Sequence, residues 1–136
     1  KWMRQVERQG DRARIADVAR HVADAYAAVV DQRPDDLDAR TRMGEAYMLT
    51  NSPMKGIQAI NQVLADDSTF VPARFQKGLA LLQINRLDQA VTQFQRVMEN
   101  ASQSNPFYQQ AKRAIEVIRG QAGSGGASGG PQGADA

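Results

Sequence analysis

Apolar residues recur at spacings of three and four along most of the first 119 residues, with polar residues between them. Two such stretches, residues 43–50 and 57–64, are separated by Asn51, Ser52 and Pro53. The spacing places apolar side chains along one face of an α-helix. Proline fits the first turn of a helix, and asparagine tolerates the left-handed conformation that ends the preceding one. The pattern therefore predicts pairs of short amphipathic helices joined by tight turns.

This pattern repeats with a period of 34 residues, as the positions of Gly44 and Gly78 show. The columns around the two glycines also match; they pair Ala46 with Ala80, Tyr47 with Leu81, Asn51 with Asn85, Ile57 with Val91, Ile60 with Phe94 and Val63 with Val97. One period earlier, a weaker third copy has Gly10, Ala13, Ala23, Tyr26, Val29 and Val30 in the same columns. Glycine costs a helix about 1 kcal/mol relative to alanine, so its recurrence predicts close helix crossings at Gly44 and Gly78.

The repeat resembles the tetratricopeptide repeat, which has a glycine and a tyrosine in its first helix, alanine and phenylalanine in its second, and a closing proline. Gly44 with Tyr47, Ala90 with Phe94, and Pro34 match these columns. The sequence departs from the family where Arg40 and Arg74 replace tryptophan and where serines replace the later prolines. The resemblance implies an all-α solenoid of about three helical hairpins at residues 3–36, 37–70 and 71–104.

The first copy allows two structures, because residues 15–20 contain no residue that favours a turn. We expect residues 1–31 to form a hairpin like the other two copies. A single long helix over the same residues is the alternative.

After the third copy, Asn105 and Pro106 open a last predicted helix, with Ala111, Ile115 and Ile118 on its apolar face. Repeat arrays need such a terminal helix to cover the apolar face of the last hairpin. We expect this cap to span residues 105–119 and to end at Gly120, so that residues 1–119 form one domain. Residues 120–136 are rich in glycine and serine, a composition typical of a flexible tail.

The sequence offers few residues for catalysis or cofactor binding. It contains no cysteine and a single histidine, His21, so that thiolate zinc sites, cysteine nucleophiles and histidine pairs are excluded. The pairs Asp35–Asp36 and Asp66–Asp67 lie at predicted turns, where aspartates cap helices. Seventeen cations interleave with fifteen anions, for a net charge of +2, which does not favour nucleic-acid binding. We therefore expect no enzyme activity, no cofactor, no metal ion and no nucleic-acid partner.

In the family that the chain resembles, the first helix of every hairpin lines a groove that holds a segment of another protein. Carried onto the second and third copies, the groove columns include Thr41, Glu45, Met48, Leu49, Phe75, Leu79, Leu82 and Gln83. The same columns of the first copy hold Glu7 and Asp11, which argues against a basic clamp for a partner's C-terminal carboxylate. Because the twin of Phe75 is Thr41, we expect Phe75 to be partly exposed and to serve as a binding anchor. The alternative is that the apolar members of this set only pack against neighbouring helices.

The resemblance favours a non-catalytic module that binds an apolar or amphipathic segment of a protein partner. The alternative function is a membrane-tethered or self-associating assembly scaffold, of the kind found in the bacterial envelope or in cytochrome maturation. The chain begins at Lys1 rather than at a methionine, and a membrane tether upstream of Lys1 would suit that alternative. No apolar run approaches the roughly 20 residues of a transmembrane helix, so we expect a soluble domain. Neither its compartment nor its partner follows from the sequence.

Overall fold

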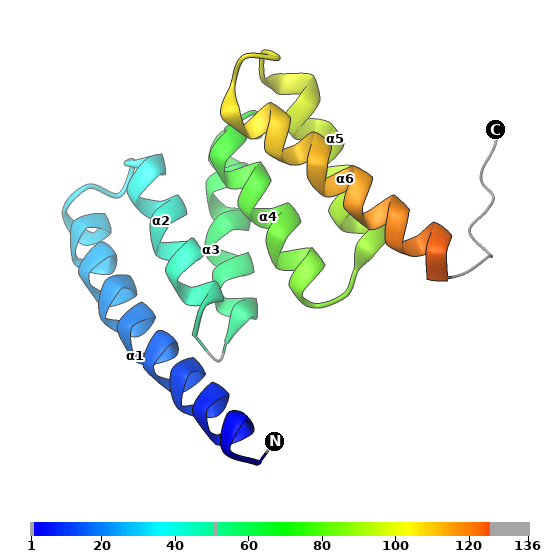
Figure 1. The fold of residues 1–136 in the computed structure, drawn as a ribbon. Helices are drawn as coiled ribbons and strands as arrows, with labels where there is room; N and C mark the ends of the chain where they lie inside the picture. Colours follow the sequence, from blue (N-terminus) through cyan, green and yellow to red (C-terminus); the bar gives the residue numbers. More distant parts are fainter. Residues whose placement is uncertain (1, 51, 126–136) are drawn as a thin grey trace.

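The computed structural model describes residues 2–50 and 52–125, and the side chains of residues 7–50 and 52–121. This part of the chain folds into six α-helices and contains no strand. Their order is α1 (Trp2–Gln32), α2 (Leu37–Met48), α3 (Pro53–Asp66), α4 (Val71–Gln83), α5 (Leu87–Asn100) and α6 (Pro106–Gly125). The expected all-α solenoid of helical hairpins is confirmed, with α2–α3 and α4–α5 as its hairpins (Figure 1).

Turn and cap residues fix the ends of these helices as their chemistry predicts. The carboxylate of Asp36 accepts a hydrogen bond of 2.9 Å from the amide of Ala39 and so caps the start of α2. Asn85 has a φ of 63°, and the amide of the following Arg86 donates to the carbonyl of Leu81 at 2.8 Å, which closes the end of α4. Asn51, the counterpart of Asn85, lies outside the described residues.

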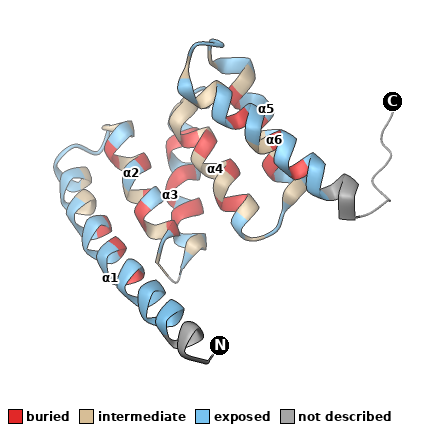
Figure 2. Ribbon diagram, in the orientation of Figure 1, coloured by how far each residue is buried: buried red, intermediate tan, exposed pale blue. Residues whose placement is uncertain are grey.

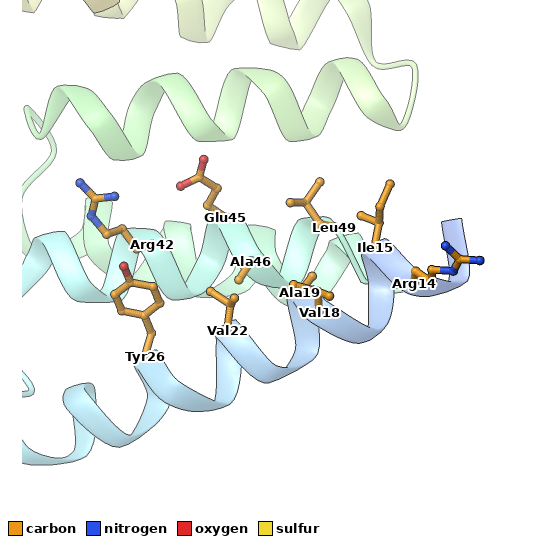
Figure 3. Close-up of a pocket in the computed structure, with 10 residues that line it drawn as sticks. All are labelled: Arg14, Ile15, Val18, Ala19, Val22, Tyr26, Arg42, Glu45, Ala46 and Leu49. Carbon is orange, nitrogen blue, oxygen red and sulfur yellow. The ribbon is translucent and has the colours of Figure 1, made fainter. Parts of the chain in front are cut away.

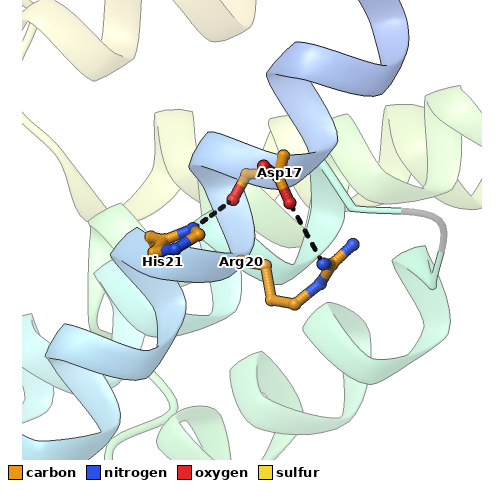
Figure 4. A network of polar contacts seen from close by, with 3 residues as sticks. All are labelled: Asp17, Arg20 and His21. Carbon is orange, nitrogen blue, oxygen red and sulfur yellow. Dashed lines mark hydrogen bonds and ion pairs between the residues drawn. The ribbon is translucent and has the colours of Figure 1, made fainter.

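The hairpin expected within residues 1–31 is wrong, because α1 is one continuous helix of 31 residues. Asp17 occupies the column of Asn51 and Asn85, yet it lies inside the helix. Its carboxylate pairs with Arg20 at 3.2 Å, and the ring of His21 donates from Nδ1 to the Asp17 carbonyl at 2.8 Å (Figure 4). With no proline or glycine in the surrounding residues, nothing here breaks the helix, and these contacts span the place where the other copies turn.

The helices form two layers, α2, α4 and α6 in one and α3 and α5 in the other (Figure 1). The core lies between them, and its fully buried larger side chains are Phe94, Ile60, Val63 and Val97. By contrast, α1 packs chiefly on α2 through small residues, and most of its described surface is exposed (Figure 2). The array is thus well packed from α2 to α6 and more open at its N-terminal end.

The glycine columns of the two hairpins lie at close helix crossings, as the period predicted. A Cβ added at Gly44 would lie 2.9 Å from Cδ1 of Ile60, and one added at Gly78 would lie 2.6 Å from Cε1 of Phe94. Gly10 differs, because a Cβ added there would meet no atom within 4 Å. In the other two copies a second helix packs across the glycine, whereas α1 is one continuous helix and supplies no second helix to this copy.

The last helix covers the end of the array, as expected of a cap. Ala111, Ile115 and Ile118 are buried in one cluster with Phe94 and Val97. The helix is longer than expected, however, because it continues through Gly120 to Gly125. One glycine lowers helix propensity by about 1 kcal/mol and need not end a helix that is held by packing. Residues 126–136 of the expected tail lie outside the described part of the chain.

Candidate functional site

The candidate site is the surface shared by α2, α4 and α6, which we call the α2/α4/α6 face. It contains two cavities. The first, of about 430 Å³, lies between all three helices and combines polar with apolar residues; its lining includes Asp38, Arg42, Glu45, Gln76, Pro72, Leu79 and Phe107. The second, of about 530 Å³, lies between α4 and α6 and is mostly apolar; its lining includes Leu79, Leu82, Ala114, Val117 and Ile118. Leu79 lines both cavities and joins them into one surface.

Five of the predicted groove residues are open to solvent. Glu45 and Gln83 are exposed, Leu49 is 56% exposed, and Leu79 and Leu82 are half-buried. The amide Nε2 of Gln83 donates to the backbone carbonyl of Met48 at 3.2 Å and so links α4 to α2. Leu79 and Leu82 lie together in the cavity between α4 and α6, whereas Leu49 lies apart from them, against α1.

Three other predicted groove residues are buried, which corrects the expectation of a partly exposed Phe75. Phe75 is only 6% exposed, and its ring centroid lies 5.5 Å from that of Phe94 and 5.2 Å from that of Phe107. Met48 is buried in a cluster between α2, α3 and α4. Thr41 is buried as well, and its hydroxyl donates to the Leu37 carbonyl at 2.7 Å. Thr41 and Phe75 therefore form part of the floor of the site, whereas Met48 belongs to the core between the helices.

Sequence reasoning missed the contribution of α6. Gln110, Arg113 and Val117 line the apolar cavity from the side opposite to α4, and Val117 is 58% exposed. Because α6 was read as a cap with one apolar face, its second apolar edge was not considered. The signal was available, because Val117 continues the apolar spacing beside the predicted apolar face, to which Ala114 belongs.

A third cavity lies between α1 and α2, where it includes Glu45 and Leu49 of the predicted groove. It has a volume of about 480 Å³, and we call it the α1/α2 groove (Figure 3). Its apolar lining comprises Ile15, Val18, Ala19, Val22, Tyr26, Ala46 and Leu49, and Arg14, Arg42 and Glu45 lie at its edges. Ile15, Val18 and Leu49 are all more than half exposed. The predicted hairpin left no groove here, because its first helix would have covered these residues.

A cluster of cations lies between α4 and α5. Burial and the nearby Arg96 lower the pKa of Arg74, and burial with Arg74 and Arg96 lowers the pKa of Lys77. The guanidinium of Arg74 donates to Gln93 at 2.9 Å and to the Ser68 carbonyl at 2.7 Å, but its buried Nε has no partner. Because the folded state disfavours the charged forms of Arg74 and Lys77, the cluster opposes folding wherever these two groups are protonated.

Replacing Lys77 with methionine, the residue that α2 has in this column, should stabilise the protein by about 0.5 kcal/mol. A lowered lysine pKa means that the folded state disfavours the proton, so the cost is present below that pKa and disappears as the pH rises through it. Urea denaturation at neutral and at alkaline pH measures the effect. The difference between Lys77→Met and the wild type should shrink at alkaline pH, and an equal difference at both would contradict the electrostatic origin.

The described residues hold no group of three or more histidine, cysteine, aspartate or glutamate side chains placed to bind a metal ion. His21 is exposed, and its ring forms a hydrogen bond with the carbonyl of Asp17 in its own helix. Asp36 caps a helix and Asp66 pairs with Arg40, as expected of acidic residues at turns. None of the described helices has the length and apolar character to cross a membrane.

Comparison with known proteins gives one distant similarity. The chain is 31% identical over 99 residues to the mouse protein DnaJ homolog subfamily C member 3. The match covers 71% of this chain but 19% of the mouse protein, so the chain corresponds to about a fifth of that relative. No protein-family model matches the sequence. The comparisons thus add a distant relationship to part of a larger protein.

Proposed function

We propose that this chain is a tetratricopeptide-type interaction module that catalyses no reaction and binds an apolar or amphipathic segment of a protein partner on its α2/α4/α6 face. The 34-residue columns, the two helical hairpins and the distant similarity to a DnaJ homolog all support this proposal. The observation that carries it is the apolar cavity between α4 and α6.

That cavity has the form expected of a peptide-binding site. Leu79 and Leu82 provide one apolar wall, Val117 and Ala114 provide the other, and Arg113 lies at the edge. Its volume of about 530 Å³ falls in the range of ligand-binding clefts. The polar residues of the cavity beside it, which include Glu45, Arg42 and Gln76, would contact the polar side of an amphipathic segment.

Replacing Val117 with glutamate should abolish most of this binding without unfolding the protein. Val117 is 58% exposed, so its loss removes little core packing, whereas a carboxylate in the cavity would be desolvated by an apolar ligand. The probe is a peptide of about 15 residues selected against the wild-type chain by display. Fluorescence anisotropy should show that its Kd rises about thirtyfold, which corresponds to about 2 kcal/mol.

Met54→Glu provides the matched control. Met54 is 55% exposed on α3, in the other layer, so the same charge at the same exposure should leave the peptide affinity unchanged. Thermal melting of both variants checks that they fold. If Val117→Glu binds the selected peptide as the wild type does, the α2/α4/α6 face is not the binding surface.

A further inference from the structure

The second half of α1 presents residues that its counterparts in the other copies bury. Tyr26 shares a column with Ile60 and Phe94, and Val29 shares a column with Val63 and Val97. The counterparts on α3 and α5 are all fully buried, whereas Val29 is 38% exposed and Tyr26 is partly exposed. In both hairpins the first helix covers these columns, α2 over α3 and α4 over α5. On α1 no first helix covers Tyr26, which instead lines the open α1/α2 groove (Figure 3).

The helix that would fit this groove belongs to the same chain but cannot reach it. In each hairpin the covering helix places a glycine against the residue sixteen positions later, Gly44 against Ile60 and Gly78 against Phe94. Gly10 and Tyr26 have the same separation. On the straight α1, however, sixteen residues correspond to about 24 Å along one helix axis. Gly10 therefore lies far from Tyr26, and a Cβ added at Gly10 would meet no atom within 4 Å.

We propose that a second copy of this chain fills the α1/α2 groove, by packing the first half of its α1 against the second half of the other α1. Two antiparallel α1 helices would bring Gly10 of each chain to Tyr26 of the other. The two-fold axis then passes near Val18, midway between these residues, and Val18 is 63% exposed. Each helix half would form the contacts of a closed hairpin, so that the exchange makes a dimer at little cost.

The straight conformation of α1 favours this arrangement over a hairpin closed within one chain. The other copies turn between Met48 and Pro53 and at Asn85, but α1 has Asp17 and Ala19 in the columns of Asn85 and Pro53. Because an uninterrupted helix cannot fold back on itself, the first half of α1 cannot cover the second half of the same helix. The first half of α1 from a second copy can do so. α1 and α6 lie at opposite ends of the array (Figure 1). A dimer that pairs through α1 therefore leaves the cavity between α4 and α6 accessible.

The absence of cysteine makes a cross-linking test direct. The Gly10→Cys chain and the Tyr26→Cys chain are purified separately, mixed, and oxidised. We expect a disulfide-linked dimer from the mixture and little from either variant alone, because identical positions lie at opposite ends of the antiparallel pair. Asp24→Cys replaces Tyr26→Cys in the control; Asp24 is exposed, as are its counterparts Gln58 and Thr92, and should not cross-link to Gly10→Cys.

A second experiment restores the missing turn. The changes Asp17→Asn, Val18→Ser and Ala19→Pro copy residues 51–53 into α1. Light scattering should give twice the chain mass of 14.9 kDa for the wild type and a single chain mass for this triple variant. Adding Gly10→Cys and Tyr26→Cys to the triple variant should give a disulfide within one chain, which shows that the closed hairpin has replaced the exchange.

Three results would overturn the proposal. A wild type that stays monomeric at all concentrations would leave the groove to another protein or to a hairpin closed within the chain. If a chain that carries Gly10→Cys and Tyr26→Cys without the three turn substitutions forms a disulfide within one chain, α1 bends in solution. A dimer that persists in the triple variant, or that lacks the mixed cross-link, would place the interface elsewhere. None of these results bears on peptide binding at Val117, so the two proposals fail separately.

Discussion

Replacing Phe75 with alanine should lower the free energy of unfolding by about 3–5 kcal/mol, the cost of truncating a buried phenylalanine. The ring is 6% exposed and packs between the rings of Phe94 and Phe107, so its removal opens a cavity where α4, α5 and α6 meet. Urea denaturation followed by circular dichroism measures the loss. Phe107→Ala is the matched control, because Phe107 is only half-buried and its truncation should cost less. If Phe75→Ala had a free energy of unfolding close to that of the wild type, Phe75 would not be part of the core, and its predicted role as an exposed binding anchor would stand.

Replacing Gly56 with alanine should destabilise the protein by about 2–3 kcal/mol, as expected for overpacking at a tight contact. An added Cβ would clash with Cγ of Met48 and would lie 2.6 Å from the Gly44 carbonyl oxygen and 3.0 Å from the Met48 amide nitrogen. Two of these three atoms belong to the backbone of α2, so the helices must move apart.

Gly120→Ala separates this clash from helix propensity. A Cβ at Gly120 would meet no atom within 4 Å, so the same substitution there should stabilise α6 by up to about 1 kcal/mol. Thermal melting compares the two variants. An increase in stability for both would mean that α2 and α3 do not approach each other as closely as described.

The sequence predicted the helices that carry local signals for their ends. The turn at Asn85, the cap at Asp36 and the crossings at Gly44 and Gly78 follow from backbone chemistry at single positions, and each is present. The end at Gly120 was wrong, because the helix continues to Gly125, and the propensity cost of about 1 kcal/mol for a glycine does not by itself end a helix.

Tertiary packing decided what local signals could not. The polar Thr41 in the column of Phe75 suggested that this column faces solvent. Its hydroxyl instead donates a hydrogen bond to the Leu37 carbonyl, which allows Thr41 to be buried. The column is therefore buried in both copies. Likewise, α1 has apolar residues at the columns of a closed hairpin, yet the residues at the expected turn favour a continuous helix. For the candidate site, the sequence located Leu79 and Leu82 and missed Val117, because that wall forms only when α6 packs beside α4.

The packing of each helix chiefly on its neighbours in the sequence has a consequence for dynamics. Contacts of short sequence separation lower the entropic cost of reaching the native state, which is typical of domains that fold within microseconds to milliseconds. Stability then varies along the array, since α4 contacts α2, α3, α5 and α6 while α1 contacts chiefly α2. α1 can therefore detach by breaking a single interface, and its amides should exchange with solvent through local openings that leave α4 protected. The helix proposed to pair between copies is thus attached to its own chain chiefly through α2.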